Sequence, residues 1–340
     1  MATEPKVAQG SLSGTPTPSP PTSPAAPTVA PAPKKYRATI YPKNREIQAP
    51  FAELIAQLEQ LLDRKIWVLI NHGRDDNDPW DEVGAILYHG FREQKAEIIP
   101  DQKVGLLIHS PGGQARSAFE IVRLFQRRTR EFVTLVPLYA KSAATLITIG
   151  GHPIYMGSEA ELGPLDVQMY DEDRETWDSA LNAVQSFERL NAYALTAYDQ
   201  AMQLFVARTG KKPQMLMPLA LQYATSIVGP LADKIDTFEV TSKSRELKVA
   251  EDYAVRVMRP NYPEAIARGI ARNLVERYST HGFVIDRSEA GTGPGGRASP
   301  FHLGLNLAKV SPEIEAVFTR LTPYLETPGP IAGQIVEANP

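Results

Sequence analysis

A serine and two adjacent glycines follow two apolar stretches in the middle of this 340-residue chain, and together they could carry out acyl transfer. Ser142 follows the apolar residues 132–138, and Gly112 and Gly113 follow the apolar residues 104–108. A serine hydroxyl can attack a carbonyl, and glycine N–H groups can approach the resulting oxyanion because no side chain obstructs them. One glycine N–H and the N–H of Ala143 would then form an oxyanion hole. The simpler interpretation is a helix N-cap at Ser142 and a plain turn at the glycines.

Alternating strands and helices must position these residues. Residues 104–108, 132–138 and 153–156 are apolar runs typical of buried strands, and helical patterns follow the first two. Upstream, residues 51–64 predict an amphipathic helix and residues 66–70 predict another buried strand. This order predicts a parallel α/β unit, in which the residues that do chemistry collect at the strand ends.

Three motifs in this central region resemble the serine dehydrogenase proteinase family, relatives of the ClpP and SppA serine peptidases. The motifs are His109-Ser110-Pro111-Gly112-Gly113, Tyr139-Ala140-Lys141-Ser142-Ala143-Ala144-Thr145 and Leu162-Gly163-Pro164-Leu165-Asp166. Thr280-His281 and Leu303-Gly304-Leu305 resemble C-terminal elements of the same family, so the likeness spans about residues 60 to 310. The resemblance implies a ClpP/crotonase-like spiral of repeated β-α units, with Ser142 as the nucleophile and oxyanion donors at Gly113 and Ala143. Residues 291–300 read as an insertion relative to this pattern.

The general base is the missing part of this site. The resemblance implies a lysine about forty residues after the serine, but residues 177–189 contain none. Asp166 lies at the position where ClpP-like relatives have a histidine and where crotonases have an acidic residue. To accept a proton as a base, its carboxylate would need a pKa that burial has raised. His281 has a suitable intrinsic pKa and matches a family histidine. The sequence does not decide between Asp166 and His281 as the base, and each could instead have a purely structural role.

Other basic side chains fit the base less well. Lys141 adjoins Ser142, and neighbouring side chains normally diverge, so we expect it to face solvent or a partner. His109 is expected to make a structural hydrogen bond at a strand end. Lys234, Lys243 and Lys248 belong to a charged helical region, where lysines are usually solvated.

Composition excludes several other kinds of chemistry. The chain has no cysteine, which excludes disulfides, thiolate catalysis and cysteine-based metal sites. Its formal net charge of −3 argues against a nucleic-acid-binding surface. Residues 75–81 contain four aspartates but lack the glycine and the distal glutamate of an EF-hand, so we expect neither a metal nor a cofactor. No run of residues approaches the length of a transmembrane segment, and no secretory signal is apparent, so we expect a cytoplasmic protein.

The chain divides into one domain and two tails. Residues 1–35 are rich in Pro, Ser, Thr and Ala and predict a disordered tail that could dock a partner. Residues 36–326 predict a single α/β domain, with a catalytic core over about 60–210 and a mostly helical part over about 211–326. Between residues 213 and 230, prolines and a glycine predict breaks in helical structure. We expect residues 327–340 to form a loose tail.

These patterns predict a serine hydrolase, and a peptidase with a peptide or protein substrate is the leading hypothesis. A crotonase-like enzyme would bind an acyl thioester in the same oxyanion hole and use Asp166 as acid or base. A domain without a base would be a non-catalytic assembly or binding module. We also expect a homo-oligomer, because folds of this kind often associate through their outer helices.

Overall fold

A six-stranded sheet lies at the centre of the domain. The computed structural model describes residues 1, 3, 34–74, 77–166, 168–171, 176–278, 280–292, 302–327 and 329–338, with the backbone alone for 168–171 and 176–178. The predicted disordered tail, apart from residues 1, 3, 34 and 35, and most of the 291–300 insertion lie outside the described residues. In spatial order the strands are β1 (Tyr36–Ala38), β11 (Ile331–Glu337), β2 (Lys65–Ile70), β3 (Lys103–His109), β4 (Glu131–Val136) and β6 (Ile154–Met156).

The four strands from β2 to β6 are parallel, as the apolar runs predict. β2 pairs with β3 from Lys65↔Val104 to Ile70↔His109, so the two strands end at the same level. β3 pairs in parallel with β4, and β4 pairs in parallel with β6. Their central residues are buried on both faces, which explains the continuous apolar runs. The parallel α/β architecture is therefore confirmed, whereas the spiral of β-α units stays a prediction.

Helices cover both faces of this sheet. Helices α1 (Ala49–Leu62) and α10 (Pro312–Leu325) pack on the face that presents Ile66, Val68 and Leu107. The opposite face, which presents Trp67, packs against α2 (Ala85–Glu93), α3 (Ala115–Arg128), α4 (Ala143–Thr148) and α7 (Thr237–Met258). A 3₁₀ turn, η1 (Gln94–Ala96), follows α2. The site region is carried by α3 and α4, which begin shortly after the ends of β3 and β4.

A second, three-stranded sheet lies beyond the end of β4. It has the order β10 (Ile285–Asp286), β7 (Glu161–Leu162) and β5 (Tyr139–Ala140). β5 is parallel to β7, and β10 is antiparallel to it. The surrounding elements are the β8–β9 hairpin (Gln168–Asp171 and Thr176–Ser179), α8 (Glu264–Arg272), the π-helix η2 (Asn273–Arg277) and α9 (Arg287–Ala290).

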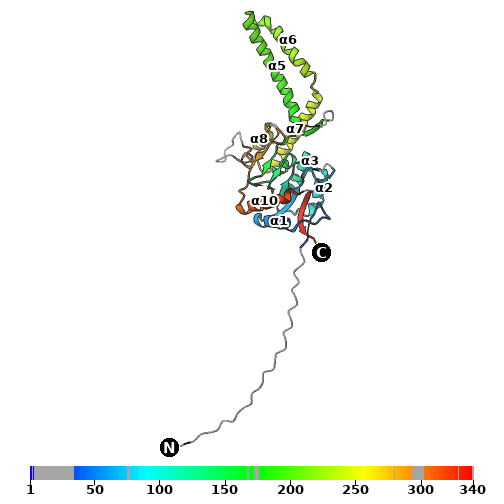
Figure 1. The fold of residues 1–340 in the computed structure, drawn as a ribbon, viewed down its shortest axis with the longest axis vertical. Coiled ribbons are helices and arrows are strands. Elements are labelled where there is room, and N and C mark those ends of the chain that lie inside the picture. Colours follow the sequence, from blue (N-terminus) through cyan, green and yellow to red (C-terminus); the bar gives the residue numbers. More distant parts are fainter. Residues whose placement is uncertain are drawn as a thin grey trace. The chain divides into compact units, whose positions relative to one another are not determined.

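Two long helices form a hairpin that extends away from the sheets (Figure 1). They are α5 (Ala180–Thr209) and α6 (Pro213–Ala232), joined at Gly210 with a positive φ of 63°. The predicted breaks between residues 213 and 230 are wrong, because Pro213 occupies the first turn of α6 and Pro218 and Pro230 lie inside it. The charged helical region that contains Lys243 and Lys248 is α7, which begins at Thr237, after Lys234. There the Asp236 carboxylate accepts from the N–H groups of Phe238 and Glu239.

Helix α6 also corrects a second prediction. The sequence predicted no run long enough to cross a bilayer. Among the described residues, Pro213–Ala232 is the one helix that is sufficiently long and apolar by length and composition, and little of it is buried. Helix α6 packs against α5 on one side only, so much of its apolar surface is exposed.

The prediction of a loose tail over residues 327–340 is wrong. Residues Ile331–Glu337 form β11, which is antiparallel to β2 and to β1 and so lies inside the main sheet. Gly333, at a φ of 109°, is needed there because a Cβ atom would lie 2.5 Å from Thr39 Oγ1 and 2.7 Å from the Ile40 nitrogen. A short strand containing a glycine gives a weak sequence signal, which explains the error.

We therefore expect Gly333→Val to lower the free energy of unfolding by about 2 kcal/mol, from backbone strain and the clash with Thr39. Urea unfolding followed by circular dichroism measures this change. Gly282→Ala is the matched control, because no atom lies within 4 Å of a Cβ added there. Equal stabilities of the two variants would contradict the structural role assigned to Gly333.

Candidate functional site

The segments that follow β3 and β4 lie side by side. The Ser110 N–H donates to the Tyr139 carbonyl at 3.2 Å, and the Lys141 N–H donates to the Ser110 carbonyl at 2.9 Å. A Cβ atom added to Gly112, whose φ is 117°, would lie 2.8 Å from Ser142 Cβ and 3.0 Å from the Ala143 nitrogen. Only glycine allows this approach, and the glycine turn is therefore packed directly against the serine.

Ser142 has a backbone conformation that side chains rarely adopt. Its φ is 48° and its ψ is −120°, immediately before α4. Such a conformation costs about 1–3 kcal/mol and occurs mainly at functional sites. The Ser142 side chain makes no capping hydrogen bond to α4. The simpler interpretation of Ser142 as an N-cap therefore does not account for its conformation.

Two backbone N–H groups beside Ser142 have no acceptor among the described residues. The Gly112 N–H donates to Ser110 Oγ at 3.0 Å. The chain around Gly113 is held by Val83, whose N–H donates to the Gly112 carbonyl and whose carbonyl accepts from Gln114, both at 2.8 Å. The N–H groups of Gly113 and Ala143 donate to no acceptor among the described residues, and the same holds for the N–H of Ser142 itself. Gly112 thus allows the glycine turn to approach Ser142 closely, while the backbone N–H groups of Gly113 and Ala143 are available as hydrogen-bond donors.

Thr145 connects the serine segment to the turn that precedes Asp166. Its Oγ1 lies 2.7 Å from the Ala140 carbonyl and 2.9 Å from the Gly163 carbonyl, and it accepts from the Gly163 N–H at 3.2 Å. A Cβ atom on Gly163 would lie 2.8 Å from Lys141 Cδ, so this turn also requires close approach. Sequence reasoning noted Thr145 only as part of a motif, and its hydroxyl fixes the spacing of the two segments.

The small sheet brings the three predicted catalytic residues to one edge. β5 ends two residues before Ser142, and β7 ends four residues before Asp166. β10 runs in the opposite direction and begins four residues after His281, with Ile285 paired with Leu162. All three residues therefore lie on segments that leave the same edge of the sheet β10-β7-β5.

Asp166 and His281 interact electrostatically. The Asp166 side chain is 3% exposed, and its carboxylate accepts from Ser179 Oγ at 2.8 Å. Burial raises the pKa of Asp166, and the Ser179 hydrogen bond and the charge of His281 partly oppose that rise in pKa. The Nδ1 atom of His281 is buried and lacks a hydrogen-bond partner among the described residues. Sequence reasoning missed Ser179, which no motif distinguishes from other serines.

The other proposed bases are occupied or unsuitable. Lys141 forms an ion pair with Glu161 at 2.7 Å and is largely buried, so the expectation that it faces solvent or a partner is wrong. The His109 side chain is buried, and this burial, together with the charges of His72 and Arg74, lowers its pKa to about 3. Imidazole with so low a pKa is a poor proton acceptor at neutral pH.

The lysines of the C-terminal helical region differ from one another. Lys234 and Lys248 are exposed, as predicted. Lys243 is buried on α7, and its ammonium forms an ion pair with Glu239 at 2.6 Å. The expectation of a solvated Lys243 is therefore wrong. Nothing in the sequence indicates that Lys243 is buried, because the residues around it are largely polar or charged.

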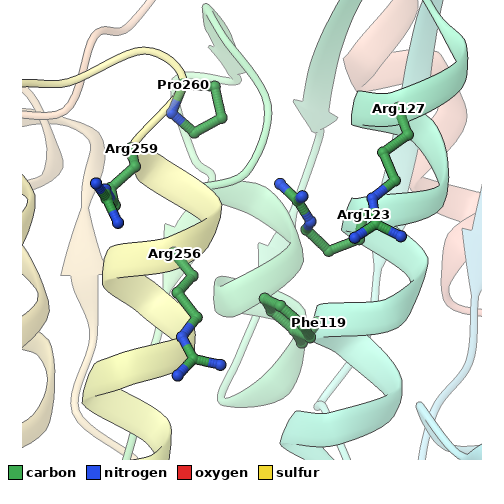
Figure 2. A pocket seen from close by; sticks show the side chains of 6 residues that line it. All are labelled: Phe119, Arg123, Arg127, Arg256, Arg259 and Pro260. Atoms are coloured by element: carbon green, nitrogen blue, oxygen red, sulfur yellow. The ribbon is translucent and has the colours of Figure 1, made fainter.

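A separate pocket lies between α3 and α7 (Figure 2). Its lining contains none of the predicted site residues and consists of Phe119, Arg123, Arg127, Arg256, Arg259 and Pro260. Arg259 is paired with Glu264 at 3.6 Å. This arginine-lined pocket therefore contributes no group to the constellation around Ser142.

Comparison with known proteins identifies the central segment. Residues 94–191 match the family described as ClpP-like SDH-type serine proteinase. This range contains the two glycines, Ser142 and Asp166 but not His281. The family predicted from the three motifs is therefore confirmed over this segment.

Two curated proteins of Methanocaldococcus jannaschii, both described as uncharacterized, resemble shorter parts of the chain. One is 38% identical over 69 residues, and the other is 32% identical over 69 residues. Each match covers 20% of this chain and 24% of the relative, so the chain spans about a quarter of the length of these curated relatives.

The lowered pKa of His109 predicts a loss of stability in acid. Above about pH 6.5 the His109 imidazole is neutral in both the folded and the unfolded chain. Below about pH 6.5 the unfolded chain binds a proton at this imidazole, whereas the folded chain does so only near pH 3. We expect this difference to remove about 1.4 kcal/mol of unfolding free energy between pH 7.5 and 5.5.

Urea unfolding of the wild type and of His109→Gln at the two pH values checks this expectation. The variant should lose less stability on acidification than the wild type. His89→Gln is the control, because His89 is exposed. An unchanged pH dependence in His109→Gln would show that the buried imidazole is not responsible.

Proposed function

We propose that this protein, whose central segment matches the ClpP-like SDH-type serine proteinases, is a serine peptidase with Ser142 as its nucleophile. The observation that carries the proposal is the packing of Gly112 against a strained Ser142, beside the N–H groups of Gly113 and Ala143, which have no acceptor within the part of the chain that the structure describes. A plain helix cap would require neither the strain nor the available donors. A nucleophile beside an oxyanion hole requires both exposure of the hydroxyl and free donors.

In this proposal, the Ser142 hydroxyl attacks the carbonyl carbon of a peptide bond. The carbonyl oxygen becomes an oxyanion and accepts hydrogen bonds from the N–H groups of Gly113 and Ala143. These donors are fixed by the Ser110 and Val83 hydrogen bonds around them, so they need little reorganisation as the charge develops. Collapse of the tetrahedral intermediate breaks the C–N bond and leaves an acyl ester on Ser142. Water then hydrolyses that ester.

His281 is the proposed base, and Asp166 positions it. His281 would accept the Ser142 proton as the C–O bond forms and return it to the leaving amine. The Asp166 carboxylate is costly to ionise because it is buried, and a protonated His281 nearby lowers that cost. This pairing is strongest when the imidazolium forms, which favours the transition state over the ground state.

The raised pKa of Asp166 also supports a second candidate function. A buried carboxyl group with a raised pKa could act as the acid or base of a crotonase-like enzyme on an acyl thioester. The same two N–H groups would bind the thioester oxygen. The peptide substrate, the homo-oligomer, the cytoplasmic location and docking by the N-terminal tail all stay predictions.

Labelling with a fluorophosphonate probe, followed by peptide mapping, tests the nucleophile. We expect label on Ser142 that disappears in Ser142→Ala and persists in the control Ser186→Ala, an exposed serine on α5. We expect His281→Gln to slow labelling by at least about 100-fold, because general-base catalysis contributes that much or more. His89→Gln is the matched histidine control, and circular dichroism verifies folding of every variant.

The outcomes separate the hypotheses. Unchanged labelling in His281→Gln would place the base elsewhere, and the buried Lys243 would be the next residue to replace. Absence of label on Ser142 together with acyl-CoA binding would support the crotonase-like enzyme. Absence of both label and acyl-CoA binding would leave the non-catalytic binding module.

A further inference from the structure

In the α5–α6 hairpin, mostly small residues face the contact between the helices and many large apolar residues face outwards, whereas most water-soluble helix pairs bury their large apolar residues. The buried residues of its outer part are mostly small: Ala197 and Ala201 on α5, and Ala220 and Ala224 on α6, together with the single large residue Leu216 near the turn. Phe205 and Tyr223 meet edge to face, with ring centroids 6.4 Å apart, which fixes how the two helices align. Small residues at a helix–helix contact are typical of pairs whose outer surroundings are as apolar as their interior.

The large apolar side chains of the hairpin point outwards. Leu195, Met215 and Leu221 are each at least 60% exposed. The exposed set extends along both helices and comprises Phe187, Tyr193, Leu195, Leu204, Met215, Met217, Leu219, Leu221, Tyr223 and Leu231. So many exposed apolar side chains on one element indicate an interaction surface, because water contact with this area is unfavourable.

Charge is distributed unevenly along the same hairpin. Residues 200–232 contain no aspartate or glutamate, although the whole chain has a net charge of −3. Their three charged residues, Arg208, Lys211 and Lys212, surround the turn, are exposed and form no ion pair among the described residues. Helix α6 itself has no charged residue over 20 residues. The surface therefore combines apolar side chains with a purely basic end.

We propose that residues 200–232 dock on the surface of a membrane that contains anionic lipids. Helix α6 would lie at the boundary between headgroups and acyl chains, with Met215, Leu219 and Leu221 inserted. The basic turn would contact lipid phosphates, each cation contributing through the negative surface potential. This inference is independent of whether Ser142 is a nucleophile.

The polar side of α5 favours docking at the interface over crossing the bilayer. Asp199, Gln200 and Gln203 are exposed near the middle of the outer half of α5. A carboxylate at the centre of a bilayer is strongly unfavourable. In an interfacial arrangement these side chains remain in water while α6 contacts lipid.

The charges also favour a membrane over a second copy of this chain. If two copies paired their hairpins side by side and parallel, the two basic turns would lie together. Residues 200–232 contain no acidic residue that could compensate this positive charge in either copy. Anionic phosphates supply the complementary charge directly. A hairpin dimer remains a distinct outcome that the experiment detects.

Vesicle flotation with the full-length protein tests the proposal. One set of vesicles contains phosphatidylcholine alone, and the other contains about 30% phosphatidylglycerol. We expect flotation with the anionic vesicles that falls as salt concentration rises. Lys211→Gln/Lys212→Gln should weaken binding to them about 30-fold, since each cation near a charged membrane contributes about a factor of five and the two factors multiply.

Matched variants identify the contact surface. Leu219→Ser/Leu221→Ser should abolish flotation, whereas Phe238→Ser, which removes an 80%-exposed side chain from α7, should leave flotation unchanged. Lys234→Gln is the exposed-lysine control outside the basic turn. Circular dichroism and urea unfolding show whether each variant keeps the fold of the domain.

Four results would overturn the proposal. One is absence of flotation with either vesicle, and another is flotation that the paired leucine and lysine substitutions do not change. The third is a concentration-dependent dimer, measured by light scattering, that disappears in Leu219→Ser/Leu221→Ser without any flotation of the wild type. That third result would assign the surface to a second copy. The fourth is equal binding to neutral and anionic vesicles, because the proposal assigns the basic turn to anionic lipid phosphates.

Discussion

The close approach of the Gly112 backbone to Ser142 is the constraint on which the site depends. The atoms of any side chain at position 112 would occupy the space next to Ser142 Cβ and the Ala143 nitrogen. This approach places the glycine turn against the Ala143 nitrogen, although the two lie on segments that follow different strands. It depends in turn on the parallel register of β3 with its neighbours and on the backbone bonds between Ser110, Tyr139 and Lys141. The strained φ of Ser142 is the local cost of that arrangement.

The small sheet β10-β7-β5 performs a different task from the main sheet. The main sheet contributes the buried strands and aligns their ends. The small sheet connects the serine segment to segments that are distant in sequence, because its two outer strands precede Ser142 and follow His281. Each pairing involves only two residues per strand. Short strands suffice because Thr145 and the backbone bond from Leu165 to Leu274 fix the same segments independently.

Sequence patterns predicted the features that rest on local periodicity. The buried strands β2, β3 and β4 follow from continuous apolar runs, and the glycine turn and Ser142 follow from their position after two of these runs. Partnerships between distant residues could not be predicted, since neither the pairing of Ile285 with Leu162 nor the burial of Lys243 has a local signal. Helix α6 was missed because prolines usually end helices, whereas here Pro218 and Pro230 are tolerated in a mostly exposed helix. β11 was missed because a glycine interrupts a short strand.

The position of β11 has a consequence for biosynthesis. The strand formed by residues 331–337 lies between β1 and β2, the first and third structured elements of the domain, so those two strands are not paired with each other directly. During translation the sheet therefore has an incomplete edge at β2 until residues 331–337 have left the ribosome. Contacts between such distant residues form slowly because a long loop must close first. A chain interrupted before residue 331 would expose the edge of β2, and unpaired strand edges are sites of aggregation.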